Sequence, residues 1–219
     1  MADINRNAAR ASPGRTRLPA AERRAVIVRA ATEVFAEVGY RAGKVADIAA
    51  RVGVTEPVVF QNFGSKAGLF AAVLERASAD VRASLNELTA DHGSTSALLA
   101  HALSPTQHQG SRQSGASPGR TKDGHPGAAY AVLFADAVGL TIEPELTQAV
   151  RQAIRAVECH LADLIRHAQA HGEIRDDLDP EAAAWFLLTV LSGRRMRSAA
   201  MPGQLEPAVI ALALGVLAP

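Results

Sequence analysis

The stretch DIAARVGVTEPVVFQNFGSK, residues 47–66, decides the fold that this 219-residue chain is expected to adopt. Its first part has the apolar spacing of a short helix over about 45–52, and Gly53 follows as a tight turn. Thr55 is a typical N-cap for a second short helix, which Gly64 ends. The side chains of this second helix that are expected to face inward are Val59, Phe60 and Phe63.

Longer helices are expected on both sides of this stretch. Upstream, apolar residues recur at helical spacing from Pro19 until Gly39, and downstream Ser65 caps a helix that continues to about Leu88. A long helix followed by two short helices across a glycine turn is the helix-turn-helix plan, in which the second short helix enters the major groove of DNA. Small helical bundles that bind no nucleic acid share this spacing, so the plan alone leaves both interpretations open.

The residues in this region favour the DNA-binding interpretation over a helical bundle that binds no nucleic acid. The segments AATEVFAEVGY at 30–40, DIAARVGVT at 47–55 and FQNFGSK at 60–66 resemble the TetR family of transcriptional regulators. The family pattern is I-A-x-x-A-G-V-S followed by L-Y-x-H-F-x-S-K, and the resemblance covers about residues 20–76 without a gap. The rest of the chain matches only in general character. The resemblance implies an all-α protein, with a three-helix helix-turn-helix head and a C-terminal helical ligand-binding and dimerisation domain.

The resemblance also implies which residues face DNA. Gln61 is the natural base reader, because its amide can pair bidentately with adenine, and Asn62 could do the same if it reaches the groove. Lys66 matches the family's phosphate-contacting lysine, and the helix N-termini at Thr55 and Ser65 would present backbone donors to phosphates. The complete set of expected DNA-binding residues is Lys44, Thr55, Glu56, Pro57, Val58, Phe60, Gln61, Asn62 and Lys66.

The chain departs from the family pattern at several positions in this region. Phe60 replaces a tyrosine whose hydroxyl commonly binds phosphate, Asn62 replaces a histidine, and Gly43-Lys44 replaces a pair of threonines. Glu56 brings a negative charge close to the groove, and Pro57 replaces a small residue. These departures predict an unusual operator or weak binding. They also motivate the alternative that the chain is a ligand-binding or protein-interaction dimer whose head has lost operator recognition.

Composition supports a soluble helical protein. Hydrophobic residues make up 48% of the chain and aromatic residues only 4%, which favours helices over sheets. No apolar run reaches the roughly 18 residues that a membrane span needs, and the N-terminus has no secretory signal. The single cysteine, Cys159, fits a reducing cytosol. We therefore expect a cytoplasmic protein that does not bind membranes.

The net charge of +1 conceals an uneven distribution. The first 76 residues carry 12 Lys and Arg against 7 Asp and Glu, whereas the remaining residues carry 11 against 15. A basic head on an acidic body is typical of a protein whose head binds a polyanion. Chance scatter of surface charge is the alternative interpretation.

The same patterns predict the domain boundaries. Residues 1–18 are polar and rich in arginine, and we expect a disordered basic arm that either contacts DNA or is a frayed terminus. The DNA-binding head is expected over 19–66 and the ligand-binding and dimerisation domain over 67–219. Residues 104–127 contain almost no apolar side chain and are expected to form a disordered loop. The histidines in and near this loop lack the spacing of metal ligands, so no metal site is expected.

The body is expected to contain a dimer interface. Residues 144–171 keep one apolar stripe, and 180–194 is apolar nearly all round, which indicates burial against more than the chain's own core. An isologous dimer is the usual solution, and it would place two recognition helices in successive major grooves. The resemblance places the interface on about 144–171 and 180–198. The expected interface residues are Ile154, Val157, Leu161, Leu164, Leu187, Leu188 and Leu191.

Family members usually hold a small-molecule cavity in the C-terminal domain, and a mostly apolar cavity favours a small hydrophobic effector. The residues expected to line it are His101, Tyr130, Phe134 and Trp185, with ordinary core packing as the competing interpretation for each. We therefore expect a TetR-type regulator, a repressor that binds an operator duplex as a homodimer and is released by this effector. No enzymatic activity and no cofactor are expected, because neither a phosphate-binding loop nor a nucleophile elbow is present in the sequence.

Overall fold

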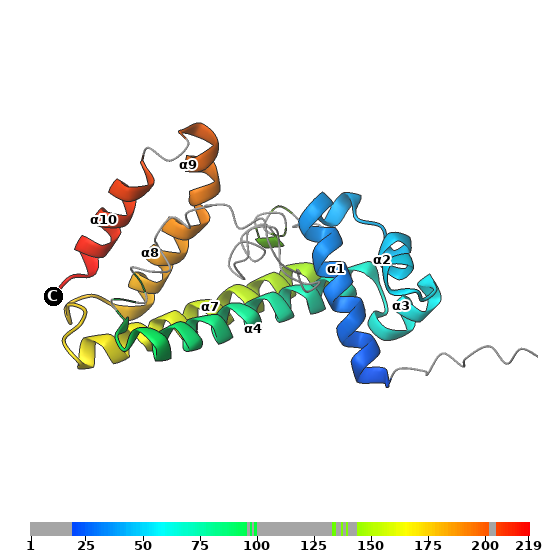
Figure 1. Cartoon of the computed structure of the whole chain (residues 1–219), viewed down its shortest axis with the longest axis horizontal. Coiled ribbons are helices and arrows are strands. Elements are labelled where there is room, and N and C mark those ends of the chain that lie inside the picture. The colour runs from blue at the N-terminus through cyan, green and yellow to red at the C-terminus, as the bar shows by residue number, and fades with distance from the viewer. Residues whose placement is uncertain are drawn as a thin grey trace, which may run out of the picture.

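The computed structural model describes residues 19–95, 97, 99, 133, 134, 137, 139, 144–201 and 205–219. All regular elements in these residues are helices, which confirms the all-α class (Figure 1). Among these helices, none is long and apolar enough to cross a lipid bilayer. The expected arm at 1–18, the expected loop at 104–127, and two expected pocket residues, His101 and Tyr130, lie outside the described residues.

Four helices form the head and its connection to the body. They are α1 (Ala20–Ala42), α2 (Val45–Val52), α3 (Glu56–Phe63) and α4 (Lys66–His92). α2 packs on α1, α3 packs between α2 and α4, and α4 leads away from the head (Figure 1). Gly53 and Gly64 follow α2 and α3 with positive φ angles of 68° and 74°, a backbone conformation that glycine adopts without strain. The two predicted glycine turns are therefore confirmed. Gly39, the predicted end of the first helix, has a non-helical backbone with a φ angle of 79°, so a break there is also confirmed, and a further helical turn follows it to Ala42.

A cluster of three aromatic rings joins α1 to α4. The Phe35 and Phe70 rings meet edge to face with their centroids 5.0 Å apart, and the Tyr40 ring lies 4.8 Å from that of Phe70. All three side chains are buried. Gly43 lies against this cluster, because a Cβ atom there would be 2.7 Å from Cδ1 of Phe35. Packing against the Phe35 ring therefore explains the glycine at a position where the family usually has threonine.

The body is built on two long helices. α4 and α7 (Pro144–Ala170) lie side by side and run away from the head in the same direction (Figure 1). Val150 on α7 belongs to a core that the head and body share, whereas Val157 and Leu161 belong to a second core within the body. Val157 and Leu161, two of the expected interface residues, are thus buried by the chain's own core, and their place in a dimer interface stays a prediction.

Three further helices complete the described body: α8 (Pro180–Ser192), α9 (Arg194–Ala200) and α10 (Glu206–Leu217). α9 was not predicted, because its seven residues have no helical apolar spacing. A bidentate pair holds it to α10: Glu206 accepts hydrogen bonds of 2.9 Å from both Nε and Nη2 of Arg197. Arg194 forms a second ion pair with Glu206 at 3.2 Å. The hydrogen bonds from Arg197 hold the pKa of the Glu206 carboxyl below its usual value.

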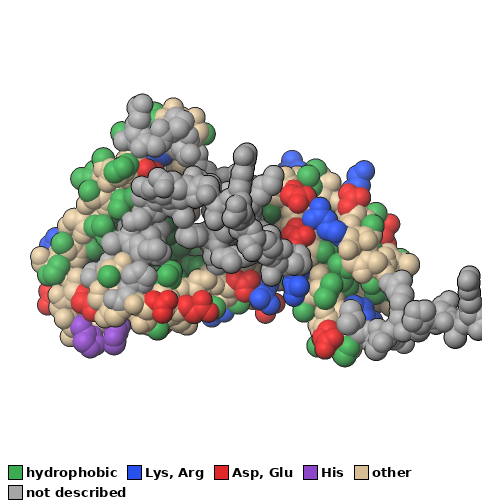
Figure 2. All heavy atoms as spheres, viewed as in Figure 1, with side chains coloured by type: hydrophobic (Ala, Val, Ile, Leu, Met, Phe, Trp, Pro, Cys, Tyr) green, Lys and Arg blue, Asp and Glu red, His purple; other side chains and the backbone are tan. Residues whose placement is uncertain are grey.

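α8 and α10 each bury one side and expose the other. Leu187, another expected interface residue, lies buried in the body's core. The other four expected interface residues, Ile154, Leu164, Leu188 and Leu191, are half-buried against the two cores. Hydrophobic side chains remain exposed along the edge of the body that α10 forms (Figure 2). The exposed large apolar residues of this region are Trp185, Phe186, Met196, Met201, Leu205, Leu212 and Val216.

Gly43→Ala should destabilise the head, because the added methyl group would overlap the Phe35 ring. Over-packing of a well-filled core typically costs about 1–3 kcal/mol, and chemical denaturation followed by circular dichroism would measure the loss. In a chain that also carries Phe35→Leu, Gly43→Ala should reduce the free energy of unfolding by less, because the smaller leucine leaves room for the added methyl group. Equal costs in the two backgrounds would show that this contact does not require glycine.

Candidate nucleic-acid interface

α3 buries one face in the head and exposes the other. Val59 and Phe63 are buried and anchor the helix. Phe60 is 41% exposed, so the expectation that it faces inward with them is wrong. Among the nine expected DNA-binding residues, Val58, Asn62 and Lys66 are half-buried, and the exposed ones are Lys44, Thr55, Glu56, Pro57, Phe60 and Gln61. The exposed face of α3 thus combines a carboxylate, a proline ring, an aromatic ring and an amide.

Asn62 is turned back onto its own helix. Its Nδ2 donates a hydrogen bond of 2.7 Å to the carbonyl oxygen of Val58. The backbone carbonyl oxygen of Asn62 accepts a hydrogen bond from Arg24 on α1. The Arg24 guanidinium also lies 4.2 Å from the centre of the Phe63 ring. Arg24 therefore fastens the C-terminal end of α3 to α1. The amide of Asn62 is occupied within α3, whereas the neighbouring Gln61 side chain is exposed.

Lys66 connects the start of α4 to the end of α1. Its Nζ donates a hydrogen bond of 3.2 Å to the carbonyl oxygen of Arg41 and lies 4.7 Å from the centre of the Tyr40 ring. Ser65 caps α4 as predicted, because its Oγ accepts a 2.8 Å hydrogen bond from the backbone N–H of Gly68. Thr55 occupies the N-cap position of α3, but its side chain makes no capping hydrogen bond. The polar groups beside α3 are therefore held by backbone and ring contacts of α1 and α4.

Two further residues that the sequence analysis did not single out position the site. Arg51 on α2 reaches Glu33 and Glu37 on α1, at 3.2 and 3.0 Å, so its charge ties the two helices together rather than facing phosphates. A Cβ atom at Gly68 would lie 2.2 Å from the carbonyl oxygen of Phe63, so this glycine lets the end of α3 approach α4 closely. Glu33 and Glu37 lie four residues apart on one face of α1, which was a sequence signal for the contact with Arg51. The sequence near Gly68 contained no comparable signal for its close approach to Phe63.

Positive charge flanks α3 rather than lying on it. The helix contains Glu56 but no Lys or Arg. Lys44 is exposed before α2, and Lys66 begins α4. On the visible face of the head, Lys and Arg side chains lie among Asp and Glu side chains (Figure 2). Such an arrangement can position a duplex through its phosphates while the exposed face of α3 meets the base edges.

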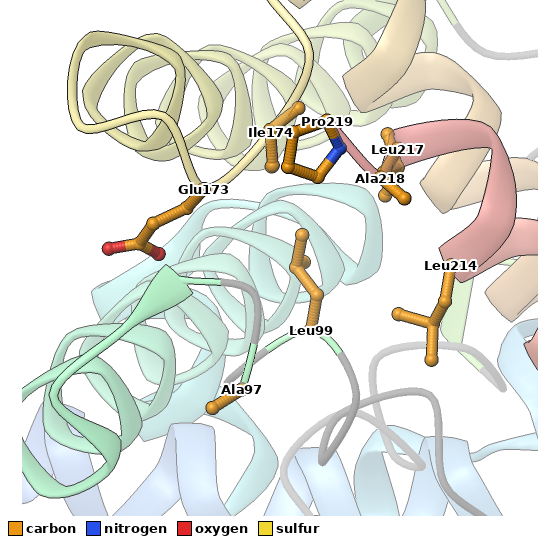
Figure 3. A pocket seen from close by; sticks show the side chains of 8 residues that line it. All are labelled: Ala97, Leu99, Glu173, Ile174, Leu214, Leu217, Ala218 and Pro219. Atoms are coloured by element: carbon orange, nitrogen blue, oxygen red, sulfur yellow. The ribbon is translucent and has the colours of Figure 1, made fainter.

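A separate cavity of about 580 Å³ lies at the end of the body farthest from the head. Apolar side chains from three parts of the chain surround it, while the Glu173 carboxylate turns away from them (Figure 3). One oxygen of Glu173 accepts a 2.6 Å hydrogen bond from the backbone N–H of Thr95. The lining residues are Ala97, Leu99, Glu173, Ile174, Leu214, Leu217, Ala218 and Pro219.

The expected pocket residues that the structure describes do not line this cavity. Phe134 is buried in the core that the head and body share, and Trp185 is 43% exposed on α8. Their expected place in an effector pocket with His101 and Tyr130 stays a prediction, because those two residues lie outside the described residues. Large side chains on aliphatic helices here fill the core or lie at the surface.

Cys159 offers no activated nucleophile. It is exposed and lies beside Glu158, a buried carboxylate that accepts a 3.1 Å hydrogen bond from Arg155. Local desolvation and the negative charge of Glu158 raise the pKa of the Cys159 thiol. A thiol with a raised pKa stays protonated at neutral pH and is a poor nucleophile.

Two regions of the chain match family models. Residues 27–73 match the model described as bacterial regulatory proteins, tetR family. Residues 141–209 match the model described as tetracyclin repressor-like, C-terminal domain. The first match contains α2 and α3, and the second contains α7, α8 and α9. Together the two matches account for just over half of the chain.

A curated relative and several solved structures are also similar. The HTH-type transcriptional activator FasR of Mycolicibacterium smegmatis is 50% identical over 60 residues. That match spans 27% of this chain and 27% of the relative's length. A TetR-family regulator from Cytophaga hutchinsonii has a TM-score of 0.72 at 15% identity, covering 91% of this chain and 96% of that one. E. coli NemR in its reduced form has a TM-score of 0.69 at 16% identity, covering 89% and 97%. At these identities the structural likeness concerns the fold.

Proposed function

Because the chain belongs to the TetR family of bacterial transcriptional regulators, we propose that it binds an operator duplex as a homodimer and responds to a small-molecule effector. The observation that carries the proposal is the exposed face of α3, which buried Val59 and Phe63 hold against the head between two lysines. Residues 19–66 would act as the DNA-binding head and 67–219 as the ligand-binding and dimerisation domain.

α3 reads bases and the flanking groups hold phosphates in this proposal. Gln61 pairs with adenine, because its amide is exposed and has the donor and acceptor that adenine requires. Lys44 and Lys66 contact phosphates on either side of the groove. Asn62 supports the shape of α3 instead of reading a base, since its amide is bonded to Val58.

Binding of the full chain to the DNA upstream of its own gene tests this function. Affinity should be tight, should fall steeply between two salt concentrations, and should exceed the affinity for an unrelated duplex. Weak and equal binding to that duplex and to a pool of random-sequence duplexes would favour the alternative, a ligand-binding dimer whose head no longer reads DNA.

The regulator acts as a repressor in our proposal, released when the effector binds. Activation is the second candidate, because the relative that is 50% identical in the matched region is named an activator. Transcription in vitro from a promoter carrying the selected operator separates them. The repressor lowers transcript yield, and an activator raises it.

The dimer forms through the exposed sides of α8 and α10 rather than through the buried stripe of α7. Four large apolar side chains lie at the surface there: Trp185 and Phe186 on α8, and Leu212 and Val216 on α10. A large exposed apolar patch is typical of a protein–protein interface. The pair between Arg197 and Glu206 keeps α10 in place beside α8 and α9 without a partner chain. An isologous dimer would cover this surface on both copies and place two α3 helices on one duplex.

The effector acts through α4 in this proposal. α4 begins at Lys66 beside α3 and contributes Leu85 to the body's core, so it spans both functional regions. A ligand that shifts α4 in the body would change the spacing of the two heads and their fit to the operator.

Lys66→Ala should weaken binding to every duplex by a similar factor and lower the salt dependence by about one phosphate contact. Electrophoretic mobility shift at several salt concentrations measures both effects. Arg76→Ala is the matched control, because it removes the same charge from an exposed position farther along α4. An unchanged salt slope in Lys66→Ala would remove this lysine from the phosphate contacts.

Gln61→Ala should relax the preference at one base pair of the best site and cost about 1–3 kcal/mol there. Asn62→Ala should leave the base preference unchanged, since its amide does not reach beyond α3. Binding to single-base-pair variants of a site selected from random duplexes compares the two. A preference altered by Asn62→Ala but not by Gln61→Ala would reverse these roles.

Leu212→Asp should convert the dimer to a monomer that remains folded, because this side chain is 71% exposed in the single chain. Val38→Asp is the control, since Val38 is 54% exposed on α1 in the head. Sedimentation velocity measures the oligomeric state, and circular dichroism checks the fold. A Leu212→Asp protein that stays dimeric would place the interface elsewhere.

A further inference from the structure

Two polar side chains on facing helices of the body have buried nitrogen atoms without partners. Nε of Arg82 on α4 and Nε2 of His160 on α7 are both inaccessible to solvent, and neither has a hydrogen-bond partner within the described residues. Buried polar atoms in folded proteins are nearly always paired, because leaving one unpaired forfeits its hydrogen bonds to water. A pair of such atoms therefore indicates a partner that the described residues do not supply.

The surroundings of this pair are apolar. Leu85 on α4 and Val157 on α7 lie within four residues of the pair along the same two helices and belong to the body's core cluster. Val81 and Leu164, equally near along these helices, are half-buried and pack against that cluster. Burial and the positive charge of Arg82 lower the pKa of His160, with Asp163 opposing them. The imidazole is therefore neutral at neutral pH, and the pair carries the single positive charge of Arg82.

Nearby acidic side chains of α7 are already engaged. Glu158 accepts from Arg155, and Asp163 accepts from Arg166. Within the described part of the chain, no carboxylate pairs with Arg82. The buried Nε of Arg82 therefore lacks a hydrogen-bond partner within the described residues, and leaving such an atom unpaired is costly.

We propose that Arg82 and His160 bind the carboxylate of the effector, which is a monocarboxylic acid with an apolar body. This assignment rests on the proposed effector response and names the chemical class of the ligand. One positive charge matches a singly charged carboxylate better than a doubly charged phosphate, and the two nitrogens supply hydrogen bonds to its oxygens. The aliphatic neighbours from α4 and α7 contact the apolar body.

Calorimetric titration of the full chain with matched acids and alcohols tests the assignment. The probes are hexanoate, decanoate and 3-phenylpropanoate, each beside the corresponding alcohol, with no DNA present. At least one acid should bind tenfold or more tightly than its alcohol. Arg82→Met should remove that difference by weakening the acid alone, whereas Arg76→Met should leave both affinities unchanged. Equal affinity for acid and alcohol, no binding of any acid, or an unaltered preference in Arg82→Met would each overturn the proposal.

A second measurement separates a ligand from a carboxylate elsewhere in the chain. Without ligand, Arg82→Met should raise the melting temperature, because it removes a buried Nε that has no hydrogen-bond partner within the described residues. A fall in melting temperature would show that the chain itself pairs Arg82 and would refute the assignment. Neither the titration nor the melting experiment contains DNA. Both therefore test the assignment of Arg82 and His160 even if the protein fails to bind an operator. Acid binding that fails to displace an operator would instead contradict the proposed regulation.

Discussion

The aromatic contact between α1 and α4 determines how the head is placed on the body. Phe70 meets the rings of Phe35 and Tyr40, and all three belong to a core that continues into the start of α7. α4 contributes both to this core and to the body's own core. Because packed rings resist relative sliding, the proposed movement of α4 in the body would be transmitted to the head rather than absorbed between them.

Several departures from the family pattern have a physical reason in this arrangement. Gly43 is smaller than the usual threonine because the Phe35 ring occupies the space of a side chain. Asn62 replaces histidine and hydrogen-bonds within α3, where it leaves Gln61 as the exposed amide. These substitutions are compatible with a head that presents α3 to a groove. They therefore weaken the case for a head that has lost its function, although Glu56 still places a negative charge on that face.

The body separates its apolar surfaces into internal and external sets. The stripe on α7 is used within the chain, where Val157 and Leu161 join Leu85 of α4 and Leu187 of α8. The outer sides of α8 and α10 have no such cover in the single chain. The ion pairs of Glu206 with Arg194 and Arg197 fix α10 through polar contacts, so its exposed leucine and valine do not depend on a partner for their position.

The sequence by itself determined the helices of the head and most of those in the body. The signals were local: glycines at 53, 64 and 172 with positive φ, the Ser65 cap, and apolar spacing along each helix. These features act through a few neighbouring backbone groups, so they can be read without the rest of the chain. The general position of the DNA-facing helix followed from the same pattern, as did the family.

Only the tertiary structure decided which surface each side chain meets. Apolar spacing showed that α7 and α8 must be covered, but the cover of Val157 and Leu187 comes from distant parts of the same chain. Phe60 was expected inside by its apolar character and lies outside, because Val59 and Phe63 already fill the contact with the head. The short α9 is held to α10 by the hydrogen bonds between Arg197 and Glu206. The buried nitrogens of Arg82 and His160, which have no partner within the described residues, become evident only when α4 packs against α7. The burial of a side chain and its hydrogen-bond partners depend on residues that are remote in sequence, so a local sequence pattern does not predict them.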